Sequence, residues 1–118
     1  MEGTVFEQYL RELYLKKGYK VTLTSASGDY GADLILEKDN KKIVVQAKRY
    51  SKPVGIKAVQ EVHSALTYYK AKEAWVVTNN DFTPAAVKLA HSNNVKLINR
   101  QQLIELSLSL KNVSKQPK

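Results

Sequence analysis

Cysteine is absent from this chain of 118 residues, which excludes disulfide bonds, thiolate metal sites and cysteine nucleophiles. No apolar run approaches the ~20 residues that a membrane-spanning helix needs, so we expect no membrane association. Residues 1–4 lack a basic segment followed by an apolar one, so we expect no secretory signal and a cytoplasmic location. Arginine is also scarce, and occurs only as Arg11, Arg49 and Arg100.

Positive charge is abundant by contrast. The chain has 19 Lys and Arg residues against 11 Asp and Glu residues, which gives a formal net charge of +8 and a sequence pI near 9.6. Such an excess is typical of a protein that binds a polyanion, and nucleic acid is the partner that it favours. Because most of these residues are lysine, contacts with phosphates are expected rather than reading of bases. Lysines that only keep the domain soluble would give the same composition.

The hydrophobic fraction of 43% is sufficient for one core, so we expect a single domain over residues 1–110 and a basic flexible tail over 111–118. Helices and strands alternate along the chain, which predicts an α/β sandwich with a central mixed β-sheet and the order αββ, then αβ, αβ and α. The predicted elements are a helix over 5–17, a strand over 19–24, a hairpin over 32–38 and 41–50, a helix from 56, a strand over 74–78, a helix over 84–90, a strand over 95–98 and a final helix.

The hairpin brings three polar residues to one face of the predicted sheet. A tight turn at Asp39 and Asn40 sets a register in which Asp33 lies opposite Gln46. Directly opposed residues share a face and have Cβ atoms ~5 Å apart, and Lys48 joins that face by the two-residue period. The opposite face is apolar and is predicted to belong to the core: Leu34, Leu36, Ile43 and Val45.

These polar residues suit metal-assisted hydrolysis of a phosphodiester. A carboxylate and an amide oxygen are hard ligands that Mg²⁺ accepts, and a neighbouring ammonium stabilises charge on a phosphate. The alternative is that Asp33, Gln46 and Lys48 are ordinary solvent-facing residues of a sheet with one wet side. Their spacing alone favours this alternative.

Two segments carry a family resemblance, GDYGAD at residues 28–33 and VQAKRY at residues 45–50. With them the chain resembles the Mrr-type branch of the PD-(D/E)XK nuclease superfamily, in which glutamine replaces the second acidic residue. The resemblance covers roughly residues 5 to 106. It implies a three-layer sandwich with a restriction endonuclease-like core, and a Mg²⁺-dependent DNA endonuclease in which Mn²⁺ can substitute. It implies no small-molecule cofactor.

The resemblance also implies roles for individual residues. Asp33 would be the metal-binding carboxylate, Gln46 the second ligand and the carbonyl of Ala47 a third. Lys48 would orient or activate the attacking water and stabilise the phosphate. Glu7 matches an acidic residue of the first helix that completes such sites, although it could equally form a capping box with Thr4.

Other positions are weaker candidates. Candidate DNA contacts are Tyr30, Arg49, Lys52 and Gln60. Gln60 has a simpler explanation as an exposed helical residue. Asp29 could approach the metal from its loop, but a role in the turn between Gly28 and Gly31 is the better explanation. His63 is expected to be a buried core histidine. Asn99 and Arg100 depart from the Asp-Gly turn that is common in the family.

Several functions remain open from the sequence. The first is nonspecific or structure-selective DNA cleavage, including a homodimer of the Holliday junction resolvase type, because a separate DNA-recognition domain is not seen. A second is a catalytically silent DNA-binding module. A third is an α/β module that regulates a partner protein without binding nucleic acid. A steep fall of DNA affinity with salt would separate the first two from the third.

Overall fold

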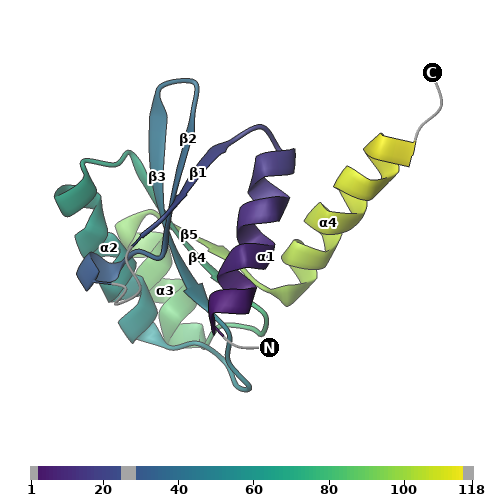
Figure 1. Ribbon diagram of the computed structural model, residues 1–118. Coiled ribbons are helices and arrows are strands. Elements are labelled where there is room, and N and C mark those ends of the chain that lie inside the picture. Colours follow the sequence, from purple (N-terminus) through teal and green to yellow (C-terminus); the bar gives the residue numbers. More distant parts are fainter. Residues whose placement is uncertain (1–2, 25–28, 116–118) are drawn as a thin grey trace.

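The computed structural model describes residues 3–24 and 29–115, and the side chains of residues 3, 4, 29 and 111–115 are not included in that description (Figure 1). The elements are α1 (Gly3–Lys16), β1 (Lys20–Leu23), a short 3₁₀ turn η1 (Asp29–Gly31), β2 (Leu34–Lys38), β3 (Lys41–Lys48), α2 (Ile56–Tyr69), β4 (Glu73–Thr78), α3 (Pro84–Asn93), β5 (Val95–Ile98) and α4 (Arg100–Lys115). Three strands, rather than the two in the expected order, separate α1 from α2, because the predicted strand over 19–24 forms β1 and pairs with β2.

The five strands form one mixed sheet in the order β1-β2-β3-β4-β5. The first three strands pair antiparallel, and β3, β4 and β5 pair parallel through the crossover helices α2 and α3. In the β2–β3 hairpin Lys38 pairs with Lys41, which confirms the predicted register. The turn residues Asp39 and Asn40 have φ of 54° and 65°, a left-handed conformation that these residue types tolerate.

Helices cover both faces of the sheet, so the three-layer sandwich is confirmed (Figure 1). One core lies between the sheet and helices α2 and α3, and it includes Ile35, Val44, Val59, Val62 and Val76. The other lies between the sheet and helices α1 and α4, and it includes Phe6, Leu10, Leu34, Leu36, Ile43, Val45 and Leu103. Strands β2 and β3 are buried on both faces, so a polar side chain near their ends, such as Gln46, lies beside apolar residues.

Local signals explain where the later helices begin. Thr83 caps α3 by accepting a hydrogen bond from the Ala86 N–H at 3.0 Å. Asn99 and Gln102 cap α4 reciprocally: the Asn99 side chain accepts from the Gln102 N–H at 3.0 Å, and the Gln102 side chain accepts from the Asn99 N–H at 2.9 Å. The segment at Asn99 is therefore an ordered helix start.

The last helices are longer than predicted. Helix α3 runs to Asn93 rather than residue 90, and α4 runs to Lys115, beyond the expected start of the tail at residue 111. No glycine or proline occurs between Arg100 and Lys115, so nothing in the sequence stops α4 earlier. None of the helices in the described part of the chain is long and apolar enough to cross a membrane.

Candidate active site

Asp33 lies where strands β2 and β3 separate. The regular pairing of the hairpin ends at Leu34 and Val45, and the Asp33 N–H then donates to the Val45 carbonyl at 2.7 Å, so the predicted pairing of Asp33 with Gln46 is not part of the ladder. Beyond this point the Asp33 carboxylate replaces the backbone ladder, because its Oδ2 accepts a hydrogen bond from the Ala47 N–H at 2.8 Å. The carboxylate is therefore fixed against the end of β3.

Gln46 and Lys48 project from β3 toward the same carboxylate on α2. The Gln46 Nε2 donates to Glu61 Oε1 at 2.9 Å, and the Lys48 Nζ lies 3.5 Å from the same oxygen. The two side chains thus share a face, as the sequence predicted. The sequence reasoning missed Glu61 and chose its neighbour Gln60, which is exposed.

A signal for Glu61 exists in the helical spacing of α2. The small buried residues Ala58 and Ala65 lie three positions before and four positions after Glu61, so all three follow one stripe of the helix. Small side chains at these positions allow the helix to approach the sheet. A polar residue on such a stripe is therefore directed toward the strands.

The Gln46 amide is buried with one group unsatisfied. Only 6% of the residue is exposed, and within the described residues its Oε1 has no hydrogen-bond partner. A carboxylate can only accept, so the contact with Glu61 requires the Gln46 NH₂ to face Glu61 and leaves the oxygen without a donor. An unmet buried acceptor costs about 1–3 kcal/mol. A bound cation would remove that cost.

The charges of the site interact. Burial raises the pKa of Asp33, the Ala47 N–H and the Lys48 ammonium lower it in part, and the Glu61 carboxylate raises it further. Burial also raises the pKa of Glu7, and the negative charge of Asp33 adds to that rise. Glu7 therefore lies within electrostatic reach of Asp33, although α1 packs on the other face of the sheet.

This proximity bears on the two explanations of Glu7. Helix α1 already begins at Gly3, so Thr4 lies inside the helix and not at its N-cap position. The side chain of Thr4 lies outside the described residues, and so does any bond that it makes. Because no described hydrogen bond or ion pair joins Glu7 to Asp33, the role of Glu7 in the site stays a prediction.

Gly31 lets the segment before Asp33 pack closely on α2. It has a φ of +81°, and a Cβ atom at this position would lie 2.0 Å from the Glu61 carbonyl oxygen. No side chain fits in that space. The contact holds the Asp33 segment directly against the turn of α2 that carries Glu61.

The predicted DNA contacts are all exposed, but they differ in their surroundings. Tyr30 has a φ of 69°, and its ring stacks on the Tyr68 ring with centroids 3.7 Å apart. Arg49 borders a small hollow beside α1 and α4, whereas Lys52 lies in the loop before α2. Among the described contacts, neither Lys52 nor Gln60 interacts with Asp33, and the side chain of Asp29 lies outside the described residues.

The expectation of a buried His63 is wrong, because this residue is exposed. It directly follows Val62, which is fully buried, and one residue along a helix turns the side chain by about 100°. Among the described residues, no three His, Cys, Asp or Glu side chains gather into a cluster that could hold a metal ion. A cation at this site would need other donors, such as the unsatisfied Gln46 amide oxygen.

Comparisons with known proteins identify the family. The restriction endonuclease family model Mrr_cat matches residues 1–107. The type IV methyl-directed restriction enzyme EcoKMrr of Escherichia coli (strain K12) is 33% identical over 86 residues, which are 70% of this chain and 28% of that enzyme. The chain thus spans less than a third of the length of that relative.

Solved structures show the same fold. The DNA modification-dependent restriction endonuclease AspBHI matches with a TM-score of 0.70 and 21% identity, over 86% of this chain and 30% of that one. The MspJI restriction endonuclease, in complex with a 27-mer oligonucleotide, matches with a TM-score of 0.57 and 19% identity, over 84% and 25% of the two chains. With nearly its whole length matched, this chain belongs to the Mrr_cat family of restriction endonucleases.

Proposed function

We propose that this chain cleaves DNA by metal-dependent hydrolysis of phosphodiester bonds, with Mg²⁺ as the cofactor and Mn²⁺ as a substitute. The observation that carries the proposal is the orphaned Gln46 Oε1, which is buried at the strand end where Asp33 and Lys48 also lie. Family membership and the oligonucleotide bound to MspJI support DNA as the substrate.

The donor set fits a hard divalent cation. Asp33 offers a carboxylate of which one oxygen is already oriented by the Ala47 N–H, and Gln46 offers its unsatisfied oxygen. Along a strand the N–H and C=O of one residue point to the same side. Because the Ala47 N–H faces Asp33, its carbonyl is directed to that side as well and is the proposed third ligand.

The chain's own residues would then complete the reaction. When bound, the metal polarises a phosphoryl oxygen and increases the acidity of a water molecule. The Lys48 ammonium stabilises the negative charge that develops on the phosphate. Glu61 positions both this ammonium and the Gln46 amide through one oxygen, and Glu7 adds negative charge near Asp33. Tyr30, Arg49, Lys52 and Gln60 remain proposed DNA contacts.

A homodimer acting in the cytoplasm belongs to the same proposal. One site of this kind cuts one strand at a time, so two copies would be needed to cut both strands together. Exposed apolar side chains on α1 and α4 support contact with a second copy: Val5, Tyr9, Leu15, Ile104 and Leu108. Helix α4 also extends away from the body of the domain (Figure 1).

Cleavage of different forms of DNA tests the proposal. The protein is incubated with linear duplex, single-stranded and four-way-junction DNA, each with Mg²⁺, with Mn²⁺ and with a chelator. We expect cleavage with either metal and none with the chelator. A clear preference for the junction would support the resolvase-type alternative. Cleavage that persists in the chelator would contradict the proposed chemistry.

The Gln46→Glu variant tests metal binding without measuring activity. The new carboxylate replaces a donor that lies 2.9 Å from Glu61 Oε1, so the metal-free variant should be less stable than the parent because of like-charge repulsion. A loss of about 1 kcal/mol would lower the melting temperature by roughly 4–8 °C. Mg²⁺ should restore the melting temperature, and the rise should be larger than in the parent.

Gln101→Glu is the matched control for this measurement. Gln101 also donates to a glutamate, Glu105, at 3.2 Å, but on the exposed surface of α4. The control should show little change in stability and no added response to Mg²⁺. Equal responses of the two variants would mean that Gln46 is not a metal ligand.

A further inference from the structure

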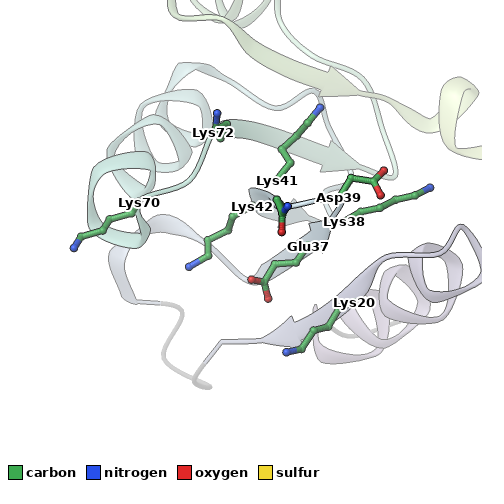
Figure 2. Close-up of a pocket in the computed structure, with 9 residues that line it drawn as sticks. Lys20, Glu37, Lys38, Asp39, Lys41, Lys42, Lys70 and Lys72 are labelled. Carbon is green, nitrogen blue, oxygen red and sulfur yellow. The ribbon is translucent and has the colours of Figure 1, made fainter.

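A lysine-rich hollow lies at the turn end of the β2–β3 hairpin (Figure 2). Its cavity volume is about 520 Å³. Six lysines from β1, from the hairpin and from the connection between α2 and β4 line it, with two carboxylates: Lys20, Lys38, Lys41, Lys42, Lys70, Lys72, Glu37 and Asp39. We refer to it as the lysine hollow. Segments far apart in the chain thus contribute lysines to this hollow, and several of their side chains diverge from one another (Figure 2).

Two of these ammonium groups are held in place without being neutralised. The Lys38 Nζ donates to the Lys17 carbonyl at 3.1 Å, and the Lys42 Nζ donates to the Tyr69 carbonyl at 3.3 Å. A carbonyl is an uncharged acceptor, so each lysine keeps its full positive charge. Lys41 differs, because it forms an ion pair with Glu73 at 3.0 Å. Lys42 lies on the α2 face of the sheet, where Glu37 is the cross-strand neighbour of both Lys42 and Lys20, whereas Lys38 lies on the α1 face. The lysine hollow therefore presents a net positive charge that is spread around the end of the hairpin.

The lysine hollow is far from the candidate active site. Lys41 and Lys48 are the first and last residues of β3. At ~3.3 Å per residue, their Cα atoms are separated by about 23 Å along the strand. Each DNA strand carries one phosphate per ~3.4 Å of helix axis, so this distance equals the spacing of about seven phosphates. An anion in the lysine hollow is therefore not the phosphate that is cleaved.

We infer that the lysine hollow binds the phosphate backbone of DNA outside the segment held at the active site. This inference rests on DNA being the ligand of the chain, as proposed above. Lysine ammonium groups bind phosphates as point charges and carry no base preference, so the contact adds affinity without sequence specificity. Several lysines that are spread over the hollow also match a row of phosphates along a DNA strand better than they match a single small anion.

DNA binding of the Lys20→Gln/Lys72→Gln variant tests the inference. Both side chains are exposed, so the fold should be retained, which circular dichroism checks. Affinity for a duplex of about 30 base pairs is measured in chelator over a range of salt concentrations. The variant should bind on the order of tenfold more weakly near 0.1 M salt, and the slope of log affinity against log salt should decrease by up to about 1.8.

Lys16→Gln/Lys88→Gln is the matched control, because it removes two exposed lysines of α1 and α3 that do not line the lysine hollow. Its affinity should stay close to that of the parent. Equal losses in both double variants would mean that affinity depends only on total charge, and no loss in either would mean that the lysine hollow does not contact DNA. Each of these results would overturn the inference. A parent protein with no affinity for DNA would instead overturn the proposed function.

Discussion

Replacing Asp33 by asparagine is expected to abolish metal-dependent DNA cleavage, with a loss on the order of 10³-fold, because the carboxylate that accepts from the Ala47 N–H at the end of β3 loses its charge. The asparagine oxygen can still accept from the Ala47 N–H, so the fold should persist. DNA affinity in chelator should be unchanged or higher, since a negative charge near the phosphates is removed. Single-turnover cleavage and equilibrium binding measure the two effects separately.

Asp33→Asn should also stabilise the metal-free protein at neutral pH. The pKa of Asp33 is raised above its ordinary value of 3.8, so the folded chain holds this proton more tightly than the unfolded chain. Ionisation of Asp33 therefore costs stability, and the cost grows as the pH rises from about 3.8 through the folded-state pKa. The difference in melting temperature between variant and parent should shrink at acidic pH.

Glu12→Gln provides the control for both measurements, because Glu12 is an exposed carboxylate of α1 that pairs only with its neighbour Arg11 among the described contacts. It should cleave and melt as the parent does. If Asp33→Asn, verified as folded, cleaves DNA at the parental rate, then Asp33 has no part in the reaction and the proposed site is wrong.

Lys48→Ala is expected to reduce cleavage by a similar factor, on the order of 10²–10³-fold, for a different reason. Its ammonium lies 3.5 Å from Glu61. Among the described contacts, it is the positive charge that lies beside the proposed metal ligands. Without it, the charge that develops on the phosphate is not neutralised. Mg²⁺ should still bind, so the rise in melting temperature on adding Mg²⁺ should persist, unlike in Asp33→Asn.

Lys88→Ala serves as the control for the loss of a lysine, because Lys88 is exposed on α3. Full activity is expected for this variant. A Lys48→Ala protein that cleaves normally at saturating DNA, or one that no longer responds to Mg²⁺, would show that Lys48 does not act on the phosphate.

The parts of the fold that local physics determines could be predicted from the sequence. The hairpin register follows from two turn residues and the two-residue period, so the neighbourhood of Asp33, Gln46 and Lys48 was accessible. The end of α4 could not be predicted, because the polar composition of residues 111–118 suggested a tail. No glycine or proline lies between Arg100 and Pro117 to end the helix earlier.

Glu61 could not be predicted from the sequence in the way that the hairpin residues could. Its contact with Gln46 joins positions 15 residues apart and depends on how α2 docks on the sheet. Helical periodicity defines which residues share a stripe but not the rotation of the helix over the strands. The resemblance therefore directed attention to Gln60, one position away, and an error of one residue on a helix changes the face by about 100°.

The close approach of Gly31 to the Glu61 backbone has a consequence for how the protein loses its activity on heating. The segment before Asp33 and the helix that carries Glu61 are packed with no room for a methyl group between them, so a displacement of either backbone breaks this contact. Local opening of either element should therefore disturb the site, even while the sheet remains folded. On heating, catalytic activity should be lost at or below the temperature at which the global structure melts.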